Sequence, residues 1–432
     1  MAKYLINSFI SILVTMLVVS VSLFWLIDIS TDDIAMKILG QFSTPEQRAS
    51  FQAQLGLDTP SWERYVEWLV GNDWRAKPLV GLPLVTVENS QSHEQEWWAQ
   101  VEGQFARWKM DDGKLLRLVR QTDGSTKSHP ADNDWKRDGQ GREYFWGVTI
   151  SNSAVLWIKG SEESRWALTE GGLRQEKGSA KKYIPLRKGL LRGDPGMSLQ
   201  FNRPVSRLLP PRIRNTVILA VAAFAVVMPL ALLLGILAGI NEGKPIDRII
   251  TVTSLIATAT PEFVTGIFLI MVFGIWLKVL PAVTLFTTSL AALENPQMLI
   301  LPVLTLTAVE LGYVARLTRT SMVEVMASPY IRTAVVKGMP HWRVVIHHAI
   351  RNALMAPITI IMLHINWLIG GVVVVEVIFG YPGLGKYIYD AAIFGDYNAV
   401  EAAAMITVGI AVATRLIGDF AYTFLNPRIR YS

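Results

Sequence analysis

Six apolar runs, each long enough to cross a lipid bilayer, constrain what this chain of 432 residues can fold into. The hydrocarbon core of a membrane needs about 20 apolar residues in a helix, which satisfies its own backbone polar groups. Hydrophobic residues make up 51% of the chain, and the mean hydropathy is +0.32, so the class of soluble globular proteins fits poorly. We predict membrane helices over residues 5–27, 215–240, 249–277, 298–317, 353–378 and 401–425.

Composition excludes several kinds of site. The chain has no cysteine, so it can form neither a disulfide framework nor a thiolate metal site. Three of its six histidines, His341, His347 and His348, lie in one basic loop, and no HExxH spacing is present. We therefore predict no metal site, and the modest net charge of +6 does not call for a nucleic-acid partner.

The first apolar run, Leu5 to Ile27, has two interpretations. It is long for the core of a signal peptide, and no small-residue cleavage site follows it. We therefore predict that residues 1–29 are a retained first helix with the amino terminus in the cytoplasm.

Residues 316–352, here called the basic loop, lie between two apolar runs and contain one acid, Glu324. Positive charges close to membrane helices are retained on the cytoplasmic side, so this loop should face inward. Lys244 and Arg248 after the second helix, and Arg428 and Arg430 after the sixth, agree with that orientation. Its basic residues are Arg316, Arg319, Arg332, Lys337, Arg343 and Arg351.

The basic loop has an internal pattern. Residues 330–336 should form a short helix, which Gly338 and Pro340 end, and helical spacing resumes over residues 342–353. We expect Val345, Ile346, Ala349 and Ile350 to share one side of this second helix. Two short helices that meet at a glycine predict a compact knob over residues 330–350.

The stretch YIRTAVVKGMPHWRVVIHHAIRNAL resembles the cytoplasmic "EAA" loop of ABC importer permeases, in the form found in the dipeptide/oligopeptide/nickel family. Ala334 and Gly338 match its most characteristic small positions. The resemblance implies that the knob docks into a groove of an ATP-binding subunit. The alternative is an ordinary basic loop beside anionic lipid. It would explain the positive charge, but not the small residues and the helix break at Gly338. The implied coupling residues are Tyr330, Ala334, Lys337, Gly338, Trp342 and Arg343.

Further motifs extend the resemblance over residues 1–70 and 190–432. They are LGLD at 55–58, GDPGMS at 193–198, VEVIFGYPGLGKYIYDA at 375–391, GDYNAV at 395–400 and DFAYTFLNPRIR at 419–430. The resemblance implies a type I ABC importer permease of the bacterial inner membrane with six transmembrane helices. It also implies two ATP-binding subunits, a second homologous permease and an extracytoplasmic substrate-binding protein as partners. ATP and Mg would belong to the partner ATPases, and we expect no cofactor in this chain.

Residues 71–187 are the chief departure from the family pattern. Segments rich in β-formers alternate here with turn signals such as DDGK at 111, which predicts a mainly β, extracytoplasmic domain inserted between the family segments 30–70 and 188–213. The permease core then occupies residues 214–432. The many tryptophans of the insert are interpreted mainly as its core, and a contact with the substrate-binding protein is the functional alternative.

Glu262, Glu310 and His364 are ionisable residues within predicted spans, where a charge costs about 2.5 to 3.5 kcal/mol at the centre. Such groups usually face the protein interior or a water-filled path. We interpret them as candidate translocation residues. Glu310 is the strongest, because an acid at this position is not part of the family pattern, and its carboxylate could meet a cationic substrate. Interhelical pairing is the alternative. Gly235 and Gly239 form a GxxxG pattern that permits close helix packing, including a dimer contact.

GYPGLGK at 380–386 superficially matches a phosphate-binding loop, but Tyr387 stands where Ser or Thr is needed and no strand precedes it. The chain therefore should not hydrolyse ATP itself. The sequence predicts a permease subunit that imports peptides, with nickel, opines or oligosaccharides as alternative cargo. A membrane-anchored enzyme with an outside domain and a secondary transporter are the other classes, but no nucleophile elbow or matched broken helices support them.

Overall fold

The computed structural model divides the chain into two compact units, each described by itself. Unit 1 comprises Met1–Leu17, Leu208–Asp390 and Ala403–Ser432, and unit 2 comprises Val18–Arg207 and Ala391–Ala402. The structure describes residues 2–28, 36, 38–40, 42–44, 47–48, 51–52, 57, 59–89, 94–159, 164–169, 172–177, 180–284 and 294–425. The LGLD segment therefore lies largely outside the described residues.

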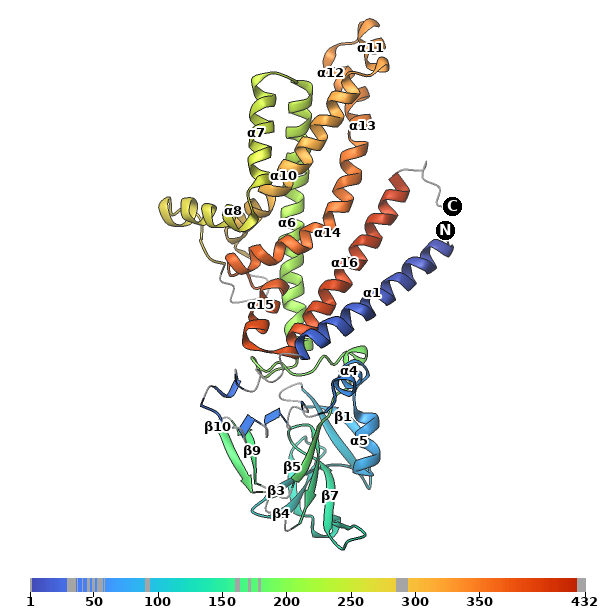
Figure 1. Cartoon of the computed structure of the whole chain (residues 1–432), viewed down its shortest axis with the longest axis vertical. Helices are drawn as coiled ribbons and strands as arrows, with labels where there is room; N and C mark the ends of the chain where they lie inside the picture. The colour runs from blue at the N-terminus through green and yellow to red at the C-terminus, as the bar shows by residue number, and fades with distance from the viewer. Residues whose placement is uncertain are drawn as a thin grey trace. The chain divides into compact units, whose positions relative to one another are not determined.

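Unit 1 is built from long apolar helices (Figure 1). They are α6 (Val205–Ile240), α7 (Pro245–Ala259), α8 (Glu262–Leu269) with its π-helical continuation η3 (Ile270–Trp276), α10 (Gln297–Met326), α14 (Met355–Ile378) and α16 (Tyr397–Leu425). α1 (Ala2–Asp28) begins in this unit and continues into unit 2, and the first residues of α6 and α16 belong to unit 2. The prediction of an α-helical core with several apolar helices is confirmed.

Three helical segments of the described chain are long and apolar enough to cross a membrane: Val205–Ile240, Gln297–Met326 and Tyr397–Leu416. A fourth candidate is the pair formed by α7 and α8–η3, which is bent by 106°. The prediction of one continuous helix over residues 249–277 is therefore wrong. Ile10–Leu26 in α1 is a shorter apolar stretch.

The bend between α7 and α8 has a local cause at Pro261. Thr260, the residue before it, is extended (φ −89°, ψ 124°), as steric contact with a following proline favours. Pro261 itself precedes the first turn of α8, so that Glu262 is the first residue of that helix. A polar pair expected in the middle of a span thus lies at a break.

The GxxxG pattern of α6 is used within the chain. A Cβ built on Gly235 would lie 2.4 Å from Thr318 Cβ, and one on Gly239 would lie 2.4 Å from Met322 Cβ. Both partners belong to α10, so these glycines allow α6 and α10 to pack backbone against backbone. The dimer interpretation of this pattern is accordingly wrong, because a partner in the same chain occupies the position.

Unit 2 contains the separate, mostly β domain. Its larger sheet has the order β1 (Leu84–Glu88), β2 (Gln95–Val101), β3 (Gln104–Asp111), β4 (Lys114–Arg120) and β5 (Thr126–Pro130), and all neighbouring strands are antiparallel. A second sheet has the order β11 (Ala180–Pro185), β8 (Ser153–Ile158), β7 (Glu143–Val148) and β6 (Lys136–Arg137). β9 (Ser164–Thr169) and β10 (Gly172–Lys177) form a separate hairpin.

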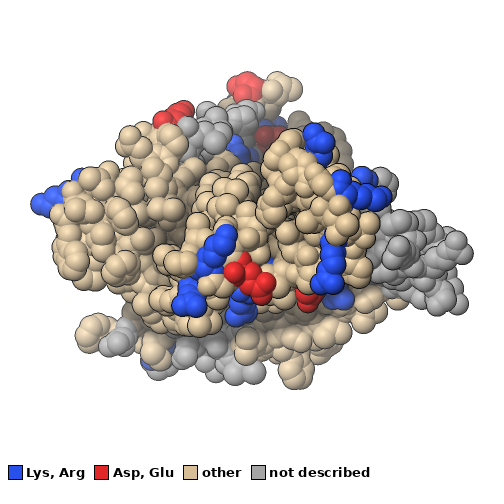
Figure 2. Space-filling view, turned by 90° about the horizontal axis from the view of Figure 1, so that it is seen from above, with Lys and Arg blue, Asp and Glu red and all other residues tan. Residues whose placement is uncertain are grey.

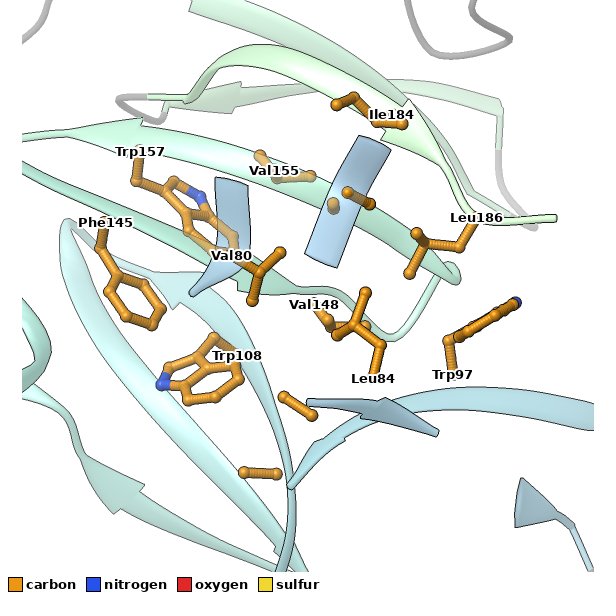
Figure 3. Close-up of a cluster of buried hydrophobic side chains, with 14 of the residues drawn as sticks. Val80, Leu84, Trp97, Trp108, Phe145, Val148, Val155, Trp157, Ile184 and Leu186 are labelled. Carbon is orange, nitrogen blue, oxygen red and sulfur yellow. The ribbon is translucent and has the colours of Figure 1, made fainter. Parts of the chain in front are cut away.

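The core of this domain is built from aromatic and aliphatic side chains of both larger sheets, together with Val80 of α5 (Asp73–Val80) (Figure 3). Phe145 lies 5.0 Å from Trp108 and 6.4 Å from Trp157, measured between ring centroids. Trp108 also donates its indole N–H to Asp134 at 2.7 Å, which satisfies its polar atom. The core interpretation thus holds for the buried tryptophans Trp97, Trp98, Trp108 and Trp157.

The chain enters and leaves the β domain through one narrow neck. Asn72 is fully buried, and its side chain accepts the Arg187 N–H at 2.9 Å and donates to the carbonyl of Pro185. A Cβ built on Gly189 would lie 2.3 Å from the backbone nitrogen of Gly71, and both glycines have positive φ. Only glycine fits this crossing, so the two ends of the insert are held together.

Because the domain core and its neck lie between residues 71 and 189, this fragment should fold by itself. We expect it to give a near-ultraviolet circular dichroism signal from ordered tryptophans and one cooperative thermal transition. Replacing Asn72 with alanine should lower the free energy of unfolding by about 1 to 3 kcal/mol, because buried backbone groups lose their partner. The exposed Asn133 is the matched control, and equal effects at the two positions would contradict the neck's role.

Candidate coupling site and membrane carboxylates

The basic loop begins as a continuation of α10. This helix runs without interruption from Gln297 to Met326, well past the predicted end at residue 317. Ser328 and Pro329 then start α11 (Pro329–Val336), with proline at its first position, where a missing N–H costs no hydrogen bond. A displacement of the knob would therefore be carried directly by α10.

The turn of the knob depends on Gly338. Its φ is +77°, a left-handed conformation that glycine adopts at no steric cost, and its N–H donates to Val335 O at 2.9 Å. A Cβ at this position would meet no heavy atom within 4 Å. The requirement for glycine is thus conformational and does not come from crowding.

The second part of the knob is helical, as predicted, but most of it is a π-helix. It consists of α12 (His341–Arg343), η4 (Val344–Ala349) and α13 (Ile350–Ala353). The buried residues are Val344, Val345, Ala349 and Ala353, and Ile346 is 54% exposed. The prediction that Ile346 shares one side with Val345 and Ala349 is therefore wrong, because these residues lie in a π-helix, which has more residues per turn than the α-helix that the pattern assumes.

The two helices of the knob share a small core. Ile331 and Ala334 of α11 pack with Val344, Ala349 and Met322, the last of which comes from α10. Ala334 is 8% exposed, and its small side chain keeps α11 close to the second helix. Ala334 therefore fixes the shape of the knob from inside.

The tip of the knob is apolar and basic on its outside. Val336 is 81% exposed and Trp342 is 57% exposed, while the guanidinium of Arg343 lies 5.4 Å from the Trp342 ring. Lys337, at the end of α11, is also exposed, and Tyr330 accepts a hydrogen bond from Asn352 at 2.9 Å. Figure 2, seen from above, shows scattered Lys and Arg, with a few Asp and Glu between them, on a largely uncharged surface. Such a tip suits a partner groove with an apolar floor and an acidic rim.

An ion pair between α7 and α10 lies just before the knob and was not predicted. Asp247, which is 3% exposed, accepts from Arg319 Nη2 at 2.8 Å and from Gly243 N–H at 2.9 Å. The sequence reveals only a basic loop at 241–248, and the partner is 72 positions away. The pair ties α7 to α10, so the helix that bears the knob is held by α6 and α7 together.

The structure brings two of the predicted pathway residues together. Glu262 at the start of α8 and Glu310 in α10 are close enough for their charges to interact, and Glu310 is 3% exposed. A Cβ on Gly371 of α14 would lie 2.9 Å from Glu262 Oε1. Three helices thus meet at these carboxylates. His364 is also in α14, but its side chain lies outside the described residues.

Comparison with known proteins identifies this arrangement. Residues 231–431 match the model of the binding-protein-dependent transport system inner membrane component, and residues 1–78 match the N-terminal model of such membrane components. The chain belongs to this family of transporter permeases. The resemblance noted in the sequence is confirmed, and the permease is a component of the inner membrane.

The permease is similar in sequence to several curated transporter permeases. It is 34% identical to the probable peptide ABC transporter permease protein y4tP of Sinorhizobium fredii, over 58% of this chain and 80% of the relative. It is 36% identical to the oligopeptide transport system permease protein AppB of Bacillus subtilis, with the same shares. The dipeptide transport system permease protein DppB of Escherichia coli K12 is 29% identical over 63% of this chain and 87% of DppB.

The family motif at 375–391 of the permease is organised by a carboxylate that sequence reasoning did not single out. Glu376 is fully buried and accepts from Thr216 Oγ1 of α6 at 2.5 Å and from Lys386 N–H at 3.0 Å. Lys386 lies in the first turn of α15 (Leu384–Phe394). The N-terminus of α15, which a phosphate would need, thus already holds a carboxylate of the chain itself.

Gly383 makes room for this arrangement, because a Cβ on it would collide with the Glu376 carboxylate. Replacing Glu376 with alanine should leave buried donors unpaired, each at about 1 to 3 kcal/mol, and lower the thermal midpoint of the purified permease. Replacement with glutamine keeps one acceptor and should have a smaller effect. Equal midpoints for Glu376→Ala and wild type, measured in detergent by tryptophan fluorescence, would contradict the assignment.

Two other family motifs are joined inside unit 2. Asp396 of GDYNAV is fully buried and accepts from the hydroxyl of Ser198 in GDPGMS and from Gln200 N–H at 3.2 Å. Asn398 donates to the Met197 carbonyl at 2.8 Å. The motifs are 198 positions apart at Ser198 and Asp396, and only the fold shows that they form one joint.

Proposed function

We propose that this permease moves di- and oligopeptides across the cytoplasmic membrane as part of an ABC importer. The observation that carries the proposal is the agreement of relatives named for peptide, oligopeptide and dipeptide transport, of which the chain covers 80% or more. Nickel, opines and oligosaccharides are alternative substrates for a permease of this fold.

The proposed topology has six membrane crossings, made by α1, α6, the bent pair α7 and α8–η3, α10, α14 and α16. The basic loops after α6 and α10 support a cytoplasmic position for both termini and for the knob. The domain over residues 71–187 would then lie outside the cytoplasmic membrane, between family segments 30–70 and 188–213.

We propose that the knob docks on an ATP-binding subunit through Tyr330, Lys337, Trp342 and Arg343. Ala334 and Gly338 would act from inside, by fixing the shape of the knob. Two such subunits, a second homologous permease and an extracytoplasmic binding protein complete the transporter, and ATP and Mg belong to the ATPases. Closure of the ATPases would displace the knob and α10. Because the knob would contact the ATPases differently in the two states, this displacement would shift the equilibrium between the inward-open and outward-open conformations of the permease.

Glu262 and Glu310 are proposed to line the translocation path. A carboxylate at the start of α8 and another within α10 are groups that usually face the protein interior or a polar route, and their combined charge suits a protonated amino terminus or a basic side chain of a peptide. His364 stays a candidate of the same path.

Uptake of labelled peptides tests the cargo. Cells that lack the permease gene should take up a labelled dipeptide or tripeptide only when the gene is restored, and excess unlabelled peptides should compete. Replacing Glu310 with glutamine should weaken uptake of lysine-containing peptides more than uptake of acidic ones. Competition by nickel or an oligosaccharide, but not by peptides, would contradict the peptide assignment.

A further inference from the structure

α4 (Ser61–Val70) of unit 2 carries an exposed apolar stripe. Trp62 is 69% exposed, Val66 is 36% exposed and Val70 is 45% exposed, and a spacing of four residues places all three on one side of the helix. Trp74, four residues further on in α5, is 54% exposed, and its indole N–H is held by Gly71 O at 2.8 Å. Three apolar side chains of α4 and, after the break at Gly71, Trp74 of α5 are thus exposed.

The buried side of α4 contains a charged side chain, Glu67, as well as the ring of Trp68. Glu67 is 8% exposed and lies 2.9 Å from Arg75. Burial raises the pKa of this carboxyl, and the charges of Arg75 and Arg187 only partly offset the effect. A surface helix of a soluble protein buries its apolar side and exposes its charges, so α4 is inverted at these positions.

Contacts with α1 fix where α4 lies. Tyr65 shares a hydrogen bond of 2.7 Å with Ser20, and Phe24 lies 5.4 Å from Tyr65 and 6.2 Å from Trp68, measured between ring centroids. α1 ends at Asp28, about one helical turn beyond Phe24. α4 therefore packs against the last turns of α1.

The lipid-facing character of α1 continues into this region. Val18, Val21 and Trp25 are 57%, 39% and 63% exposed, as expected for a helix surrounded by lipid. Tryptophan is enriched at the membrane–water interface, where its ring is buried and its N–H stays near polar groups. The helix α4 thus adds Trp62, Val66 and Val70 to the exposed apolar side chains near the end of α1.

We propose that α4 is an interfacial helix, whose Trp62, Val66 and Val70 insert among the lipid headgroups and upper acyl chains beside the end of α1. The occupant of the stripe is thus lipid, and the helix anchors the entrance of the β domain to the membrane surface. This proposal does not depend on the cargo or on the coupling role of the knob.

Site-directed spin labelling tests the proposal, and the absence of cysteine gives every label a single attachment point. Cysteine replaces Trp62, Val66 or Val70 in separate full-length chains, reconstituted in nanodiscs of phosphatidylcholine and phosphatidylglycerol. The control replaces Ile150, which is apolar and 58% exposed in the turn that joins β7 and β8. Collision rates of the nitroxide with oxygen and with a water-soluble nickel chelate are then measured.

We expect a ratio of oxygen to nickel collisions several-fold higher at all three α4 positions than at Ile150. Nickel accessibility equal to that at Ile150 would overturn the proposal, since the stripe would then face water. Low collision rates with both reagents would also overturn it, because a protein partner would then cover the stripe. Agreement among three independent positions guards against a single misfolded variant, and each chain must elute as wild type in size-exclusion chromatography.

Discussion

Replacing Gly338 with valine should abolish ATP-driven uptake while leaving the permease in the membrane. The residue has φ +77°, and a β-branched side chain is strongly disfavoured there, at a cost of about 1 to 2 kcal/mol or more. The turn between α11 and α12 should then open, and the proposed docking surface around Trp342 would be lost. Peptide uptake by whole cells and recovery of the ATPase with the tagged permease are the two measurements.

Replacing Gly338 with asparagine is the matched control for this prediction. Asparagine tolerates the left-handed conformation, and a Cβ at this position meets open space, so the knob should keep its shape. Loss of uptake in both variants, with the ATPase retained in both, would contradict a conformational role. Normal uptake with valine would show that the turn is not needed.

Replacing Gly235 with leucine should severely destabilise the helical core of the permease. Even the first carbon of the new side chain would lie 2.6 Å from the Ala315 carbonyl oxygen, so α6 and α10 would have to separate. Overpacking commonly costs about 1 to 3 kcal/mol, and backbone cannot yield as a side chain can. We expect a large fall in the yield of monodisperse permease in detergent and in its thermal midpoint.

Ala225 provides the control on the same helix. It is exposed in α6, so the substitution Ala225→Leu adds similar bulk towards lipid and should leave yield and midpoint near those of wild type. If Gly235→Leu were tolerated as well as Ala225→Leu, the close packing of α6 on α10 would not exist.

The sequence predicts most of this fold because hydrophobic length and turn chemistry are local signals. The apolar runs correspond to α1, α6, α10, α14 and α16, and turn residues mark the strands of the β domain. The prediction fails at Pro261, because the steric effect of proline on Thr260 breaks a run that hydrophobic length alone predicts as one helix. It fails at Ile346 because a π-turn has a different period from the α-helix that the pattern assumes.

The candidate site is only partly predictable, since its contacts join distant segments. Gly338 is identified by the knob pattern, and Glu262 and Glu310 stand out as acids in apolar runs. Two contacts do not stand out in the sequence: Asp247 with Arg319, and Glu376 with Thr216. Each residue looks like an ordinary surface charge or an ordinary motif residue until its partner is known. These contacts join residues that are far apart in the sequence, so no local hydrophobic periodicity can predict them.

Photo-crosslinking at the tip of the knob tests the central claim of ATPase coupling most directly. A benzophenone side chain replaces Val336, which is 81% exposed, and in a control it replaces Val252, which is 55% exposed on α7. On irradiation of membranes that contain the whole transporter, we predict an adduct with the ATP-binding subunit at position 336 and not at 252. If position 336 labels only lipid, or labels the ATPase no more than position 252 does, the knob is not the coupling element.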